Sequence, residues 1–430
     1  MKRKFWAPKI QGAAIKELKE IQLKLLKQEL SHVYANSKFY HEKFKKANIK
    51  PSDITTLEDI RKIPITTRTE LEGNFQDVLS VPFDKVLTIR QTSGTTGAPM
   101  TVAHSRNDVE SAAEASARKL TLHGITSKDR VQVTALYGLF QGAWSIHWGL
   151  NKIGVCEIPV GPGDTERQIR LIKNFSTTII YGVTNYHLRI AEVAELTGQD
   201  LSKSSLRGGI CVSEKPTVQQ KERMKNELGY KNIFLDYGAT EFPGFSVYCE
   251  EDTEGHHIWA DKYLVELVDP QTMEPLADGE RGELVITSLQ REASPLIRYS
   301  SQDIVEYYGF QQCNCGMSHP KVGTEIDRKD FMVKVRGVPV FPSKVEALLV
   351  NFPELTGRCQ IIIDKTSPKQ RFTIKAETNS ELSVSKQQLI KESLQEQLKT
   401  KFDVTLTLDD ATFVPIGVFE DKMKKSIVIG

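Results

Sequence analysis

The chain is 430 residues long, with 39% hydrophobic and 26% charged residues, which is ordinary for a globular protein and enough for two or three domains. A formal net charge of +2 excludes the strongly basic surface of a typical nucleic-acid-binding protein. No apolar run reaches the roughly 18 residues of a membrane span. No secretory signal follows the basic N-terminus, so we expect a cytoplasmic protein with no nucleic-acid or membrane partner.

The first part of the chain is predicted to be helical, because apolar residues recur at helical spacing from Ile15 to Ala47. Further on, VLTIR (Val86 to Arg90) has the character of a short strand. It leads into QTSGTTGAPM (Gln91 to Met100), a segment of small residues rich in glycine and hydroxyl groups.

This glycine-rich segment suggests a bound phosphate. Without Cβ atoms, backbone N–H groups can turn toward an anion, and the hydroxyl groups add further donors. The spacing matches neither a Walker A loop nor the dinucleotide pattern G-x-G-x-x-G. The segment therefore indicates phosphate without saying which kind, and an ordinary surface turn is the alternative.

The middle third alternates apolar strands with amphipathic stretches such as Thr165 to Phe175, which predicts a largely parallel sheet flanked by helices. The predicted strands are Arg130 to Tyr137, Val155 to Gly161, Thr177 to Val183 and Arg207 to Ser213. Ligands of such sheets lie outside the carboxyl ends of the strands.

After about Asp261 the pattern changes to antiparallel-looking strands, YLVELVDP, GELVITSL and DIVEYY. The last hundred residues combine predicted helices, KVEALLVNFP and SKQQLIKESLQEQLKTKF, with strands, CQIIID, RFTIKAE and TLTLDDATFVP. This is a compact α+β unit large enough to be a domain, and the charged stretch Ile326 to Phe331 marks its boundary.

Four polar motifs follow these elements: YGATE (Tyr237 to Glu241), RYSSQD (Arg298 to Asp303), DRKD within residues 326–343, and EDKMKKS (Glu420 to Ser426). Each alone is typical of a solvated surface. Together with TSGTTG, and in this order, they resemble the core motifs of the adenylate-forming superfamily, and most closely its phenylacetate-CoA ligase branch. FWAPKI, GDTERQIRLI, CNCGMSHPKV and RGVPVFPSKVEALL extend the resemblance over essentially the whole chain.

The resemblance implies an α/β fold with a large N-terminal domain of sheets flanked by helices, residues 1–326, and a small mobile α+β C-terminal domain, residues 331–430. Residues 327–330 would form the hinge, with Asp330 as the residue about which the small domain turns. The implied enzyme is an ATP-dependent, AMP-forming acid–thiol ligase. It uses ATP, Mg²⁺, coenzyme A and a small-molecule carboxylic acid, and forms an acyl adenylate before the thioester.

The resemblance also assigns the nucleotide site. Tyr237 would stack near adenine, Thr240 would donate to the α-phosphate, Glu241 would hold Mg²⁺, and Asp303 would accept from the ribose hydroxyls. The remaining residues implied to bind ATP or AMP are Ser93, Gly94, Thr95, Thr96, Gly97, Ser213, Glu214, Asp236, Gly238, Ala239 and Arg328. Lys422 matches the catalytic lysine of the terminal motif, and Lys424 and Lys425 are its rivals.

Two further sites follow from the resemblance. The aryl-acid pocket would be lined by Tyr137, Phe140, Gly142 and Ala143, although core packing explains such residues equally well. A structural Zn²⁺ would be held by Cys249, His257, Cys313 and Cys315. Here His256 and His319 compete with His257, and reduced buried cysteines are the alternative to a metal site.

The chain departs from the family pattern at Ala98, where lysine is usual, at Val212, where glycine is usual, and at Ser300, where arginine is usual. We therefore keep two alternatives to an aryl-acid–CoA ligase. One is an adenylating enzyme that passes the acyl group to an amine or a carrier protein, and the other is a non-catalytic nucleotide- or acyl-binding homologue. The exact acid and the oligomeric state stay open, with a homodimer as one candidate.

Overall fold

The computed structural model describes residues 5–92, 99–329, 333–335, 338–364, 371–401, 408–416, 418–419 and 427–429. The chain divides into two compact units, of which the first comprises residues 1–301 and 305–325 and the second comprises 302–304 and 326–430. Each unit has its own hydrophobic core.

The N-terminal region is helical, with α1 (Pro8–Gln11), α2 (Ile15–Asn36), α3 (Lys38–Lys46), α4 (Arg68–Leu71) and α5 (Phe75–Val78), and with the 3-10 turns η1 (Pro51–Asp53), η2 (Glu58–Lys62) and η3 (Phe83–Lys85). The predicted helical character of Ile15 to Ala47 is confirmed, and the structure divides this region into two helices at Ser37. This residue has extended backbone angles, and its side chain caps α3 by accepting from the Tyr40 N–H. A capping side chain thus ends the regular structure although the apolar spacing continues.

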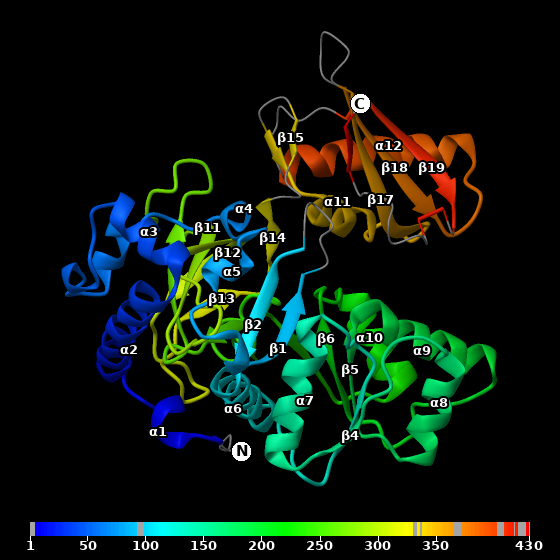
Figure 1. The fold of residues 1–430 in the computed structure, drawn as a ribbon. Coiled ribbons are helices and arrows are strands. Elements are labelled where there is room, and N and C mark those ends of the chain that lie inside the picture. The colour runs from blue at the N-terminus through cyan, green and yellow to red at the C-terminus, as the bar shows by residue number, and fades with distance from the viewer. Residues whose placement is uncertain are drawn as a thin grey trace. The chain divides into compact units, whose positions relative to one another are not determined.

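The α/β part contains a five-stranded parallel sheet in the order β4-β3-β5-β6-β7 (Figure 1). Its elements are β3 (Arg130–Val133), α7 (Gln141–Ile153), β4 (Cys156–Ile158), α8 (Thr165–Asn174), β5 (Ile179–Val183), α9 (Thr184–Leu196), β6 (Gly208–Val212), α10 (Val218–Leu228) and β7 (Asn232–Asp236). The strand–helix alternation read from the sequence is confirmed, and both faces of the sheet are apolar because helices cover both.

Alternate side chains of the parallel sheet enter two different cores. On β5, Ile180 packs with α8, α9 and α10, whereas Ile179 and Tyr181 pack on the opposite face with Leu120 and the apolar side of α7. Leu120 belongs to α6 (Arg106–Leu122), which follows the hairpin of β1 (Val86–Gln91) and β2 (Thr101–Ser105).

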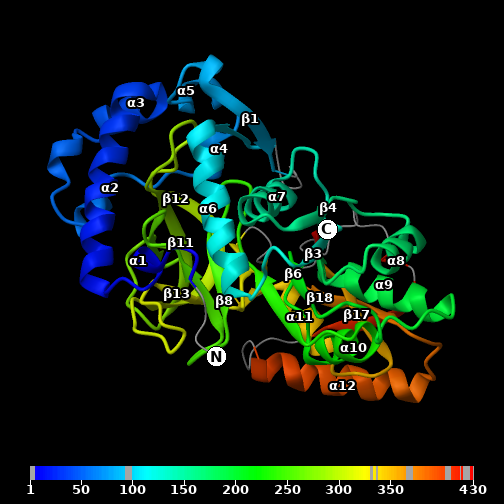
Figure 2. The same ribbon diagram turned by 90° about the horizontal axis from the view of Figure 1, so that it is seen from below.

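Helix α6 lies between two sheets, as Figure 2 shows. Its residues Ala115 and Leu122 pack with Val247 of the second, largely antiparallel sheet and with Trp259, which directly follows a strand of that sheet. The strands of that sheet are β8 (Ser246–Cys249), β9 (Gly255–Ile258), β10 (Tyr263–Val268), β11 (Arg281–Ser288), β12 (Tyr299–Gly309) and β13 (Lys321–Gly323), and the two-residue strand β14 (Asp327–Arg328) pairs with β12 as the seventh. One helix therefore serves the cores of both sheets.

The second unit is built on a four-stranded sheet in the order β19-β18-β17-β20. Its elements are β14 (Asp327–Arg328), β15 (Val333–Val335), β16 (Val338–Val340), α11 (Pro342–Leu349), β17 (Leu355–Asp364), β18 (Arg371–Thr378), α12 (Val384–Lys401), β19 (Asp410–Pro415) and β20 (Ile427–Ile429). This mixed helix–sheet unit agrees with the predicted fold class. The hinge at 327–330 stays a prediction.

Among the described residues, no helix combines the length and the apolar composition needed to cross a membrane.

Candidate active site

Two groups of predicted nucleotide contacts, those that begin at Ser213 and at Tyr237, lie at the carboxyl ends of two neighbouring parallel strands. Val212, the last residue of β6, pairs with Asp236, the last residue of β7, so Ser213 and Tyr237 begin adjacent loops. Ser213 and Glu214 are exposed, and Ser213 has a φ of +69°, unusual for a residue with a Cβ. This is the edge of the sheet at which ligands of parallel sheets bind.

Tyr237 lies in a cluster of aromatic rings at this edge. Its buried ring meets Phe245 and His256 edge-on, with ring centroids 5.4 and 5.7 Å apart, and Ser246 Oγ donates to its carbonyl oxygen at 2.8 Å. These contacts fix the orientation of the ring. Gly238, Ala239 and Thr240 follow in a turn and are exposed or half-buried.

The carboxylate of Asp236, a predicted nucleotide contact, already has two protein partners. The Lys119 ammonium lies 2.6 Å from Oδ1, and the Tyr181 hydroxyl donates to Oδ2 at 3.1 Å. Burial raises the pKa of the Tyr181 hydroxyl, and the nearby negative charge of Asp236 raises it further. Asp236 therefore ties the end of β7 to α6 and β5.

Glu241 is buried beside a positive charge. The Tyr299 hydroxyl donates to Glu241 Oε1 at 3.2 Å, and Arg68 Nη1 lies 3.7 Å from the same oxygen. Arg68 Nη2 also donates to Thr92 Oγ1 at 2.8 Å, at the start of the glycine-rich segment. Burial lowers the pKa of Arg68, but the hydrogen bond that its guanidinium donates to Glu72 and the negative charge of Glu241 raise it, and the net shift is upward.

Arg68 was not found from the sequence, because nothing in the motifs links it to Glu241. It begins the short helix α4, whose N-cap Thr67 forms a capping box with Glu70. The structure brings its guanidinium to Thr92 and to the carboxylate of Glu241, the residue predicted to hold Mg²⁺.

Several predicted residues lie outside the described part of the chain: Ser93, Gly94, Thr95, Thr96, Gly97, Asp330 and Lys422, together with its rivals Lys424 and Lys425. Within the second unit, Asp303 and Arg328 are paired across β12 and β14, and Arg328 Nη1 lies 2.9 Å from Asp303 Oδ1. The buried Ser300, which replaces an arginine of the family pattern, donates to the carboxylate of Glu283.

The predicted acid-pocket residues lie between β3 and the first turn of α7. The Tyr137 hydroxyl donates to Glu157 Oε1 at 2.6 Å, and His147 Nδ1 lies 2.6 Å from the other oxygen. Phe140 is 37% exposed, whereas the Ala143 side chain packs in the core against the parallel sheet.

A cluster of three thiols and one imidazole is formed by Cys249, His257, Cys313 and Cys315, all buried, with their candidate ligand atoms within 4.8 Å of one another. The Sγ atoms of Cys249 and Cys313 are 3.9 Å apart, and Cys315 Sγ is 3.5 Å from His257 Nε2. Tetrahedral Zn²⁺ with ordinary bond lengths requires about 3.8 Å between sulfurs and about 3.6 Å between sulfur and nitrogen. The residues present therefore fit a closed, structural zinc site.

Hydrogen bonds select His257 over its two rivals. His257 Nδ1 donates to the His319 carbonyl oxygen at 3.0 Å, which leaves Nε2 as the atom that faces the thiols. Both ring nitrogens of His319 form hydrogen bonds with the backbone: Nδ1 accepts from the Ala260 N–H, and Nε2 donates to the Ile10 carbonyl oxygen. His256 lies on the other face of β9, against Tyr237.

The cluster also favours a thiolate. Hydrogen bonding from Cys315, together with His257, lowers the pKa of Cys249 despite burial. A thiolate is the form of cysteine that binds metal.

The chain belongs to the AMP-binding enzyme family. The AMP-binding enzyme family matches residues 9–290, and the AMP-binding enzyme C-terminal domain matches residues 337–429. Phenylacetate-coenzyme A ligase of Escherichia coli (strain K12) is 35% identical over 372 residues, which cover 86% of this chain and 84% of that protein. The Thermus thermophilus protein of the same name is 33% identical over 377 residues, which cover 87% of this chain and 84% of that protein.

The fold is also that of solved acyl-CoA ligases. A crystal structure of 2-hydroxyisobutyryl-CoA ligase with 2-HIB-AMP, in the postadenylation state, superposes with a TM-score of 0.87 at 23% identity, covering 99% of this chain and 92% of that one. The predicted family and fold class are therefore confirmed. The predicted cytoplasmic location, the oligomeric state and the individual site roles stay predictions.

Proposed function

We propose that the protein is an AMP-forming carboxylic acid–CoA ligase that acts on an aryl acid such as phenylacetate through an acyl adenylate. Family membership and the similarity to two phenylacetate-coenzyme A ligases support this activity. The observation that carries it is the convergence of Arg68 and Tyr299 on the buried carboxylate of Glu241, with Arg68 also bound to Thr92.

In the first step, an oxygen of the substrate carboxylate attacks the α-phosphorus of ATP, and pyrophosphate leaves. Negative charge moves onto phosphate oxygens, so the protein contributes mainly positioning and electrostatic stabilisation. Arg68 and the segment from Ser93 to Gly97 would bind the departing pyrophosphate, and Thr240 would donate to the α-phosphate. Mg²⁺, held by Glu241, would neutralise phosphate charge when bound.

In the second step, the thiol of coenzyme A attacks the acyl carbon of the adenylate, and AMP leaves. Asp303, oriented by Arg328, would accept from the ribose hydroxyls and hold the nucleotide. Lys422 would contact the α-phosphate and carboxylate oxygens during the first step and withdraw when the C-terminal unit turns about Asp330.

A structural Zn²⁺ at Cys249, His257, Cys313 and Cys315 is part of this proposal. The ligand spacing and the hydrogen bond from His257 Nδ1 support it. The acid would lie between Tyr137 and Phe140, where Glu157 holds the Tyr137 hydroxyl in one direction.

The direct test is acid-dependent release of pyrophosphate from ATP and Mg²⁺, measured across aryl and aliphatic acids with and without coenzyme A. We expect arylacetic acids to stimulate release, and coenzyme A to yield AMP and a thioester. Lys422→Ala should abolish release while ATP binding persists, with Lys424→Ala and Lys425→Ala as matched controls.

The other outcomes separate the alternatives. Release without a thioester would indicate an amine or a carrier protein as acceptor. If no acid of the panel stimulates pyrophosphate release although the protein still binds nucleotide, the result would support the non-catalytic homologue and contradict the proposal.

A further inference from the structure

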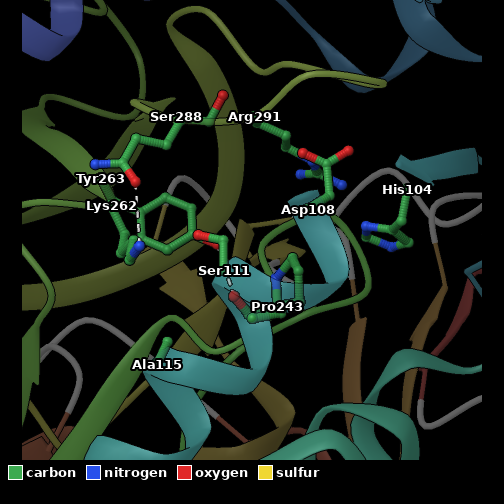
Figure 3. Close-up of a pocket in the computed structure, with 11 residues that line it drawn as sticks. His104, Asp108, Ser111, Ala115, Pro243, Lys262, Tyr263, Ser288 and Arg291 are labelled. Carbon is green, nitrogen blue, oxygen red and sulfur yellow. Dashed lines mark hydrogen bonds between the residues drawn. The ribbon is translucent and has the colours of Figure 1, made fainter. Parts of the chain in front are cut away.

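A small polar cavity lies in the first unit, beside α6. Its volume is about 30 Å³, enough for one or two water molecules. Arg291, Asp108 and His104 line one side of it, as Figure 3 shows. Asp108 is fully engaged with the backbone, since its carboxylate accepts from the N–H groups of Ser105, Glu292 and Ala293.

Arg291 connects this cavity to the main chain of Glu241, the candidate metal ligand. The residue is 6% exposed, and its Nη1 donates to the carbonyl oxygen of Glu241. Its own N–H donates to the carboxyl group of Glu29, on α2, at 3.2 and 3.3 Å. Among the described residues, Arg291 Nε and Nη2 find no acceptor, so water in the cavity is their natural partner.

The carbonyl that Arg291 binds belongs to a turn without regular structure. Glu241 lies between the end of β7 at Asp236 and the start of β8 at Ser246, so no strand ladder fixes its main chain. A buried carbonyl requires a donor, and a guanidinium is a rigid, charged one. The Arg291 side chain thus takes the place of the missing ladder at this residue.

We propose that Arg291 is a positioning residue, which holds the main chain of Glu241 so that its carboxylate stays at the Mg²⁺ position. This inference rests on the proposed function, in which Glu241 is the metal ligand. Arg291 makes no contact with the carboxylate itself and acts through the peptide carbonyl, with Glu29 anchoring it from α2.

The test measures the Mg²⁺ concentration for half-maximal ATP–pyrophosphate exchange, at saturating ATP and acid, together with the melting temperature. Arg291→Met removes charge and donor at similar length. We expect its Mg²⁺ requirement to rise about tenfold or more, the effect of losing a charge-assisted hydrogen bond, with the KM of the acid unchanged. Arg291→Lys, which keeps a charged donor, should recover much of the shift.

A matched control is Arg118→Met. Arg118 is also a buried arginine of the first unit, but it pairs with Asp261, at 2.9 Å. This variant should lower the melting temperature and leave the Mg²⁺ requirement of the remaining folded enzyme unchanged. If Arg291→Met behaves like this control, Arg291 is merely structural and the inference is wrong.

Two further variants separate the possible failures. If Glu241→Gln raises the Mg²⁺ requirement and Arg291→Met does not, only the positioning role is overturned. If Glu241→Gln leaves it unchanged, the metal role of Glu241 fails, and the inference with it. Should Arg291→Met not fold, Arg291→Gln, whose shorter neutral side chain cannot reach the carbonyl, takes its place under the same criterion.

Discussion

Arg68 offers the sharpest test of the phosphate site. Replacing it by methionine keeps an unbranched side chain of similar reach and removes the guanidinium. In the structure this guanidinium donates to Thr92 Oγ1 at 2.8 Å and lies 3.7 Å from Glu241 Oε1, so a phosphate bound there would accept a charge-assisted hydrogen bond.

Such a bond contributes about 1.5–3 kcal/mol. The Arg68 side chain is 18% exposed, so solvent screening favours the lower end, which corresponds to about tenfold in binding. We expect Arg68→Met to raise the KM for ATP and the inhibition constant of pyrophosphate about tenfold in ATP–pyrophosphate exchange. The KM for the acid should not change.

The control is Glu72→Gln. It breaks the ion pair that Arg68 makes within one helical turn, at 2.7 Å, but leaves the guanidinium in place. Loss of this pair should reduce stability by no more than about 0.5 kcal/mol and leave the KM for ATP near its original value. An unchanged KM in Arg68→Met, or an equal rise in Glu72→Gln, would refute the reasoning.

Three other predictions concern stability and metal. Burial raises the pKa of Glu29 from its ordinary 4.5 to about 8, so the folded state binds a proton that the unfolded state has lost. The free energy of unfolding should therefore fall as pH rises between these values, by up to about 1.4 kcal/mol per pH unit. In urea titrations from pH 5 to 8, Glu29→Gln should flatten this trend. Equal slopes of the unfolding free energy against pH in the variant and the original protein would contradict the prediction. Gly149→Ala should cost about 1–3 kcal/mol in the same assay, because its Cβ would lie 2.5 Å from Ser116 Cβ, and Ser116→Gly should recover part of this cost if the clash is its cause. Cys313→Ser should remove zinc measured by elemental analysis and lower the melting temperature, and an unchanged metal content would reject the zinc site.

The sequence predicts the parts of this fold that depend on local pattern. Alternating strands and helices identify the parallel sheet, and the motifs after β6 and β7 fall at its ligand-binding edge. The break at Ser37 was missed because apolar spacing continues through it, and only the capping hydrogen bond reveals it.

The candidate site is predictable only where its residues belong to recognisable motifs. Arg68 and Arg291 reach Glu241 from α4 and from the loop after β11, and their approach depends on how separate elements pack. Likewise, Asp236 is recognisable as a motif residue, but its pairing with Lys119 of α6 follows from the packing of that helix between two sheets.

Strand β9 places two histidines side by side, His257 toward the thiols and His256 toward Tyr237. A slip of the strand by one residue would therefore still offer an imidazole to the cysteines, so the thiol cluster alone does not select the correct register. Gly255 selects the register, because a Cβ at its position would lie 2.4 Å from the Val322 carbonyl oxygen on the paired strand β13. Any slipped alignment puts a side chain there, which means that the smallest residue of the strand keeps the two histidines from exchanging places.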